Sequence, residues 1–136
     1  MARVLIPFSD FASGQRAVRR LLQEPRDPRQ SVELVAMVDP LTSGKVAVFV
    51  SSAQAEAHSR AAAEQWIERL AAQLDTAALP HTASIAVGPR RELLRRIGER
   101  KDIDRVLLGT RSRDPFRRWR RQSVAHLMDR PLVSVS

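Results

Sequence analysis

The chain has 136 residues, of which 43% are hydrophobic and 28% charged, and its formal net charge is +8. This length and balance predict one globular domain, residues 1–136, and argue against global disorder. The absence of cysteine excludes disulfides, thiolate metal sites and thiol catalysis.

The first third of the chain predicts a strand, a helix and a second strand. Arg3–Phe8 and Val32–Val38 are short apolar runs bounded by polar residues, typical of buried parallel strands. Ser9 and Asp10 are both good N-cap residues for a helix over Phe11–Gln23. The apolar residues of this helix that can share one face are Phe11, Val18, Leu21 and Leu22.

The middle of the chain predicts a long helix over Ser52–Leu74. Ser51 and Gln54 stand at capping-box spacing at its start. Its apolar positions form one predicted stripe: Ala57, Ala61, Ile67, Leu70, Ala71 and Leu74. Before it, the β-branched run Val46–Val50 follows a turn signal and is a candidate extra strand.

Strands and a helix continue to alternate toward the C-terminus. Strands are predicted over Thr82–Val87, Arg105–Leu108 and Leu132–Val135, and a helix over Pro89–Glu99. This alternation indicates right-handed crossovers and an open, twisted α/β fold, in which helices cover both faces of a parallel sheet.

A last helix is predicted between the final two strands. Asp114 is a good N-cap and Pro115 a good first helical residue, which favours a helix from Pro115 to about Met128. Phe116, Trp119, Ser123 and Leu127 then fall at helical spacing. A start near Ser123 remains open.

The charge excess is concentrated in residues 90–121. This window holds thirteen basic and five acidic residues, a net charge of +8, so the rest of the chain is neutral. Such a concentration attracts phosphates or acidic surfaces. Its densest part predicts a patch for a polyanion or an acidic partner, formed by Arg117, Arg118, Arg120 and Arg121.

Sequence motifs for catalysis and for membrane insertion are missing. The five glycines are too widely spaced for a dinucleotide-binding turn, and neither H-E-x-x-H nor G-x-S-x-G occurs. The three histidines lack ligand spacing, so neither a metal site nor an enzyme is predicted. No apolar run approaches the roughly 20 residues of a membrane span, and Val4–Phe8 is too short for a signal-peptide core. We therefore expect a cytoplasmic protein without a membrane partner.

Ligands of open α/β sheets bind beyond the carboxyl ends of the strands, and here the residues resemble a known family. The resemblance extends over almost the full length, because five groups of residues occur in the expected order and spacing. They are Leu5–Phe8 with Arg16–Val18, Val38–Pro40, Val87–Pro89 with Glu92–Leu94, Val106–Arg113, and His126–Val133. Together they resemble the universal stress protein family.

The resemblance implies a flavodoxin-like sheet of five parallel strands in the order 3-2-1-4-5, and a dimer formed through Leu132–Val135. Many members bind ATP through a G-x2-G-x9-G-[S/T] loop and an Asp after the first strand. Transferred to this chain, the implied cofactor-binding residues are Ser9, Asp10, Val38, Gly109, Arg111, Ser112, Arg113, Gln122 and Ser123.

The chain departs from this ATP-binding pattern at three positions. Ser112 and Gln122 replace the second and third glycines, and Ser9 stands where the Asp is expected, with Asp10 one position later. A Cβ hinders the close approach of backbone N–H groups to phosphate. We therefore expect a non-enzymatic stress-response protein with weak or lost ATP binding. A genuine ATP- or AMP-binding member, and a basic module that binds nucleic acid or an acidic partner through residues 111–121, are the alternatives.

Overall fold

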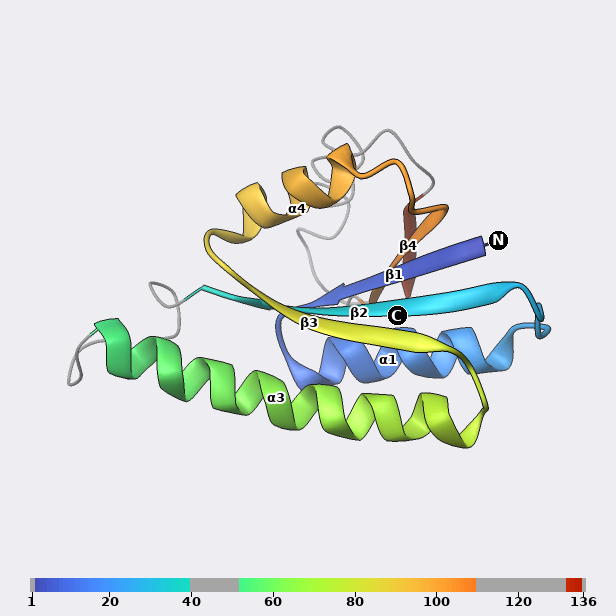
Figure 1. Ribbon diagram of the computed structural model, residues 1–136, viewed down its shortest axis with the longest axis horizontal. Coiled ribbons are helices and arrows are strands. Elements are labelled where there is room, and N and C mark those ends of the chain that lie inside the picture. The colour runs from blue at the N-terminus through green and yellow to red at the C-terminus, as the bar shows by residue number, and fades with distance from the viewer. Residues whose placement is uncertain (1, 40–51, 110–131, 136) are drawn as a thin grey trace.

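The structure is a computed structural model, which describes residues 2–39, 52–109 and 132–135. Its helices and strands are β1 (Ala2–Phe8), α1 (Phe11–Gln23), β2 (Gln30–Val38), α3 (Ser52–Thr76), β3 (His81–Val87), α4 (Arg90–Glu99), β4 (Arg105–Gly109) and β5 (Leu132–Val135). The strands pair in parallel in the order β3-β2-β1-β4-β5 (Figure 1). The predicted α/β class with a parallel sheet is confirmed.

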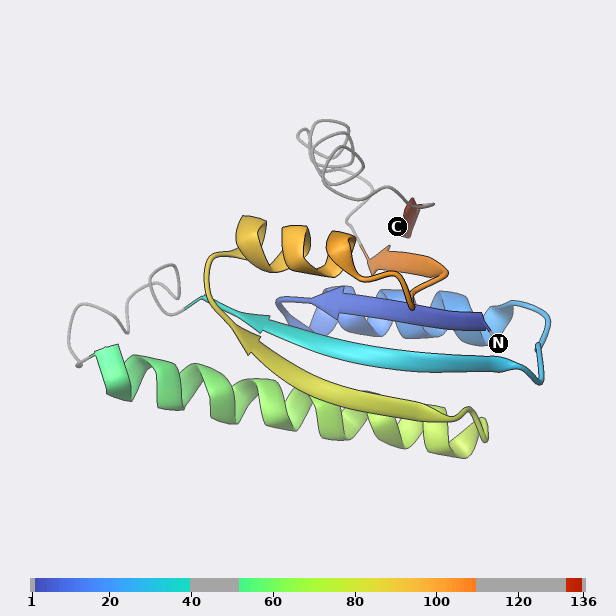
Figure 2. The same cartoon turned by 45° about the horizontal axis from the view of Figure 1, so that its top comes forward.

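Helices cover both faces of the sheet. Figures 1 and 2 show α1 and α3 on one face and α4 on the other. Side chains alternate across β1 accordingly: Val4, Ile6 and Phe8 belong to the core cluster on the α1 and α3 side, whereas Leu5 belongs to the cluster under α4. A strand buried on both faces needs a continuous apolar run, which explains why β1 shows no polar alternation.

Helix α1 starts at the predicted residue, but its buried face differs from the prediction. Asp10 is the N-cap, and its carboxylate accepts a hydrogen bond from the Ser13 backbone N–H at 2.7 Å. The buried residues of α1 are Gly14, Ala17, Val18 and Leu21. Leu22 is 39% exposed, because its position on the helix lies beyond the stripe that contacts the sheet.

The predicted stripe of α3 is wrong in its N-terminal half. Ala57 and Ala61 are exposed, whereas Ala63, Leu70 and Leu74 are buried. The first turns of α3 extend past the carboxyl ends of β2 and β3 (Figures 1 and 2), so no sheet lies beside them to bury a side chain. Alanine is also a weak indicator of the buried face of a helix, because it can lie in the core or in water at little cost in free energy.

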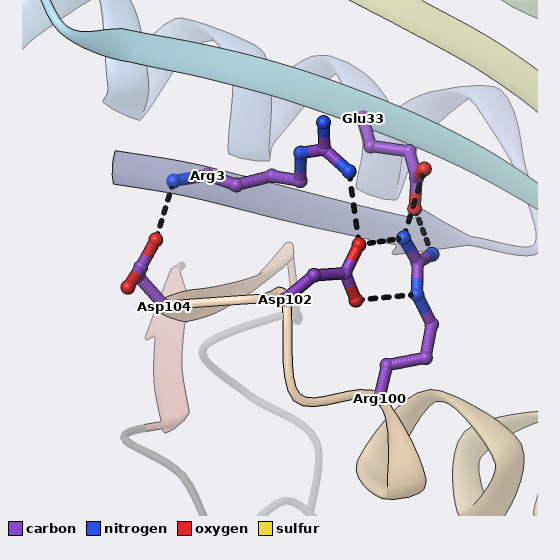
Figure 3. Close-up of polar contacts among 5 residues, drawn as sticks. All are labelled: Arg3, Glu33, Arg100, Asp102 and Asp104. Carbon is purple, nitrogen blue, oxygen red and sulfur yellow. Dashed lines mark hydrogen bonds and ion pairs between the residues drawn. The ribbon is translucent and has the colours of Figure 1, made fainter. Parts of the chain in front are cut away.

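A network of ion pairs joins the C-terminus of α4 to β1 and β2. It lies at the end of the sheet opposite to the carboxyl ends of the strands. Figure 3 shows the Arg100 guanidinium between Glu33 and Asp102, with Arg3 reaching the same Asp102 carboxylate. Arg100 Nη2 lies 2.7 Å from Asp102 Oδ2, and Arg3 Nη1 lies 2.9 Å from it. The Arg3 backbone N–H donates to Asp104 at 2.7 Å.

These contacts change the proton affinities of two groups in the network. Hydrogen bonds from Arg100, the largest cause, lower the pKa of Asp102 to about 2. Hydrogen bonds to Asp102 and Glu33 raise the pKa of Arg100. Asp102 and Arg100 therefore stay ionised over the physiological range, and the ion pair of Arg100 with Glu33 fastens the end of α4 to the sheet.

Two predicted elements lie outside the described residues. These are the candidate strand Val46–Val50 and the last helix, predicted from Pro115 to Met128.

Candidate functional site

A cavity of about 360 Å³ lies at the carboxyl ends of the strands, beside α3. Its lining residues come from the end of β2, from α3, from the start of α4 and from the residues that follow β1, β2 and β3. They are Ser9, Met37, Val38, Asp39, His58, Ser59, Ala62, Trp66, Gly88 and Arg90. The volume falls at the lower end of the range of about 300–1,000 Å³ that is usual for small-molecule sites.

The end of β2 and Gly88, the residue that follows β3, both line this cavity. The Gly88 backbone N–H donates to the Val38 carbonyl oxygen at 2.9 Å, which extends the pairing of the two strands by one residue. Gly88 has a φ of +148°, a conformation that side chains with a Cβ rarely adopt. Glycine is therefore required here, because the chain turns sharply from β3 into α4 beside the cavity.

Helix α3 forms one wall of the cavity. His58, Ala62 and Trp66 are spaced four residues apart, so they lie on one face of the helix, and Ser59 lies beside them. Trp66 is partly buried and packs against the core cluster. The wall thus changes from polar at the exposed helix end to aromatic near the core.

The structure assigns different positions to Ser9 and Asp10. Ser9 lines the cavity, in the place where the family resemblance implies an Asp. Asp10 is the N-cap of α1, and its carboxylate is bonded to the Ser13 N–H. Asp10 therefore stabilises the helix, and Ser9 is the residue of this pair that lines the cavity.

Gly109 ends β4 against the first turn of α1. A Cβ at this position would lie 1.8 Å from the Ser13 carbonyl oxygen, and Arg16 Nη2 donates to the Gly109 carbonyl at 3.3 Å. The close approach of two backbones is sufficient reason for glycine here, independent of any phosphate.

The remaining predicted site residues lie outside the described part of the chain. They are Arg111, Ser112, Arg113, Gln122 and Ser123 of the implied loop, and Arg117, Arg118, Arg120 and Arg121 of the basic patch.

The arginines of the described part of the 90–121 window are largely paired with carboxylates. Arg96 lies 3.1 Å from Glu92, Arg95 lies 3.1 Å from Glu99, and Arg105 lies 2.7 Å from Glu24. By sequence, residues 90–109 hold seven basic and four acidic residues, while residues 110–121 hold six basic and one acidic. Most of the net charge thus belongs to residues 110–121.

Sequence reasoning missed the α3 wall of the cavity. The signal was present, because His58, Ala62 and Trp66 have a spacing of four residues within a segment predicted as helix. The sequence did not reveal that α3 extends past the carboxyl ends of the strands, and that this face of the helix lines a cavity there. Gly88 and Arg90 were placed correctly after a strand and at a helix start, but were not recognised as site residues.

The lining residues can hold a planar ring with polar groups at its edge. Met37, Val38, Ala62 and Trp66 provide apolar surface, and hydroxyl and charged side chains surround it. Within residues 2–39, 52–109 and 132–135, no cluster of three or more His, Asp or Glu side chains could hold a metal ion. No helix in the described part is long and apolar enough to cross a membrane.

The family model of the universal stress protein family matches residues 1–127, and the chain belongs to this family. The resemblance that was inferred from the sequence is therefore confirmed. The search of curated protein sequences returned no match.

Several solved structures share the fold at low sequence identity. A universal stress protein family member from Burkholderia pseudomallei has a TM-score of 0.74 and 12% identity, and the match covers 98% of this chain and 95% of that chain. A family member from Arabidopsis thaliana, solved with AMP bound, has a TM-score of 0.69 and 11% identity, covering 99% and 91%. A universal stress protein in complex with cAMP has a TM-score of 0.68 and 13% identity, covering 99% and 97%.

Proposed function

We propose that this protein is a non-enzymatic, regulatory universal stress protein that binds an adenine nucleoside monophosphate at the carboxyl ends of its strands. The observation that carries the proposal is the cavity of about 360 Å³ between β2 and α3, with apolar walls and a polar rim. Ligands of open α/β sheets bind at this edge. Two structurally similar family members were solved with AMP and with cAMP.

We propose further that ATP binds weakly or not at all. The support comes from the sequence, in which Ser112 and Gln122 replace two glycines of the loop that holds the triphosphate in many family members. A monophosphate depends less on that loop, because it lacks the β- and γ-phosphates of a triphosphate.

Thermal denaturation with AMP, adenosine and Mg²⁺-ATP tests this proposal. A ligand present at a hundred times its dissociation constant stabilises the fold by about 2.7 kcal/mol, which raises Tm by several degrees. We expect AMP to raise Tm clearly and ATP to raise it less. No shift with millimolar AMP contradicts the proposal, and an equal or larger shift with ATP contradicts the preference.

Two variants on α3 test whether AMP binds in the cavity. Ala62→Leu adds bulk to the cavity wall, whereas Ala72→Leu adds the same bulk on an exposed position of the same helix. We expect the first to abolish the AMP-induced shift and the second to leave it unchanged.

A second candidate function is binding of a nucleic acid or an acidic protein by residues 111–121. The observation that favours it is a contrast in charge. Arg95, Arg96 and Arg105 are paired with carboxylates, whereas this segment holds six basic residues and only one acidic residue by sequence. Replacing Arg117, Arg118, Arg120 and Arg121 by Gln is expected to abolish a salt-dependent gel shift with short RNA or DNA. Unchanged binding by this variant would exclude the segment.

We also propose a homodimer through Leu132–Val135. β5 lies at the end of the strand order, and an apolar edge strand invites pairing with another chain. Sedimentation that shows only a monomer at tens of micromolar contradicts this part of the proposal.

A further inference from the structure

We infer that Trp66 is the specificity-determining residue of the cavity, and that the heteroaromatic base of the ligand stacks on its indole. This inference rests on the proposed function, because it names the group that recognises the base. It extends the proposal by placing the recognition on α3, rather than on the loop that follows β4.

The position of Trp66 holds its ring at the border between core and cavity. Trp66 lines the cavity, and it also packs against the core cluster on the α1 and α3 face of the sheet. The side chain is partly buried, so one part of the indole is fixed by packing and another remains open to a ligand. Such an arrangement lowers the conformational entropy lost when a ring stacks on it.

The residue one turn before Trp66 leaves its ring uncovered. Side chains on a helix incline toward the N-terminus, so the Trp66 indole lies over the turn that contains Ala62. Ala62 contributes only a methyl group, and it too lines the cavity. A larger residue at 62 would occupy the place that a base needs.

Polar groups stand where the edge of a stacked ring would lie. Ser59 is on the same face of α3, and Ser9 lines the cavity from the end of β1. Their hydroxyls can both donate and accept hydrogen bonds, which suits the ring nitrogens and amino group of a purine. The apolar surface of Met37 and Val38 completes the enclosure from β2.

Fluorescence of Trp66 provides a direct test. The chain has two tryptophans and no tyrosine, so Trp119→Phe leaves Trp66 as the dominant emitter. We expect AMP to quench this emission with the same dissociation constant that calorimetry measures, and ribose 5-phosphate to leave the emission unchanged. Calorimetric binding of AMP without any change in Trp66 emission overturns the inference and leaves the proposed function standing.

Two variants of Trp66 test its contribution to affinity. Stacking of a base on an aromatic side chain corresponds to about 5- to 140-fold in affinity, so Trp66→Leu is expected to weaken AMP binding by that factor. Trp66→Phe retains an aromatic ring and is expected to lose much less. A purely structural role predicts equal losses for AMP and ribose 5-phosphate, and that result, or unchanged AMP affinity in folded Trp66→Leu, overturns the inference. No calorimetric binding of AMP to the unaltered protein overturns the proposed function, and this inference with it.

Discussion

The Ser13 carbonyl oxygen lies so close to Gly109 that a Cβ added to Gly109 would stand 1.8 Å from it. The same Cβ would lie 2.8 Å from the Ser13 carbonyl carbon and 3.1 Å from the Ala17 nitrogen. All three atoms belong to the backbone of α1, which cannot move aside as a side chain can. The end of β4 and the first turns of α1 are therefore packed at a distance that only glycine permits.

Gly109→Ala is expected to destabilise the fold by about 2 kcal/mol or more, because overpacking against a fixed backbone forces β4 and α1 apart. Urea denaturation at neutral pH measures the loss. Gly14→Ala is the comparison: its Cβ would meet Leu70 Cδ1, the end of a flexible side chain, at 2.8 Å, and α1 gains about 1 kcal/mol in helix propensity. A smaller loss is expected for Gly14→Ala, and equal stability of Gly109→Ala and the unaltered protein contradicts the packing argument.

Two leucines predicted to face the core from neighbouring helices differ in burial, and their alanine variants are expected to differ in stability. Leu70 of α3 has no exposed surface, whereas Leu22 of α1 is 39% exposed. Leu70→Ala leaves a cavity in the core and is expected to cost about 2–5 kcal/mol, while Leu22→Ala is expected to cost about 0.5 kcal/mol or less. Chemical denaturation of both variants checks the ranking, which similar losses would refute.

Local sequence patterns predict most element boundaries in this chain, because each boundary depends on nearby residues. Asp10 marks the start of α1, and Pro25 follows its end, so α1 is predicted at its observed bounds. The burial of Leu22 and Ala61 was predicted wrongly, because it depends on where the helix lies relative to the sheet. The same dependence hides the cavity, since Trp66 becomes a site residue only through the position of α3 beside the carboxyl ends of the strands.

Ser9 and Asp10 are adjacent, yet substitutions at the two positions are expected to affect different properties. Asp10→Ala removes the acceptor for the Ser13 N–H and is expected to lower stability by about 1 kcal/mol, with little change in AMP affinity. Ser9→Ala removes a hydroxyl from the cavity and is expected to weaken AMP binding while stability changes little. Denaturation and calorimetry on both variants separate the effects. A loss of stability in Ser9→Ala larger than in Asp10→Ala would reverse the assignment.

Asp102 makes the stability of the fold depend on pH in the acid range. Its pKa falls from an ordinary value of 3.8 to about 2, chiefly through hydrogen bonds from Arg100, so its stabilisation is complete above about pH 4 and is lost as the pH falls toward 2. Asp102→Asn is therefore expected to be less stable than the unaltered protein at pH 7, with a difference that shrinks between pH 4 and pH 2. Because the Asp102 side chain is half-exposed, the difference at pH 7 should also decrease in high salt.

Urea midpoints from pH 7 to pH 2.5 check this prediction. The control is Glu64→Gln, which removes one exposed carboxylate on α3. If the stability difference between Glu64→Gln and the unaltered protein also shrank between pH 4 and pH 2, the effect would come from net charge. It would then not come from the network of Arg3, Glu33, Arg100 and Asp102.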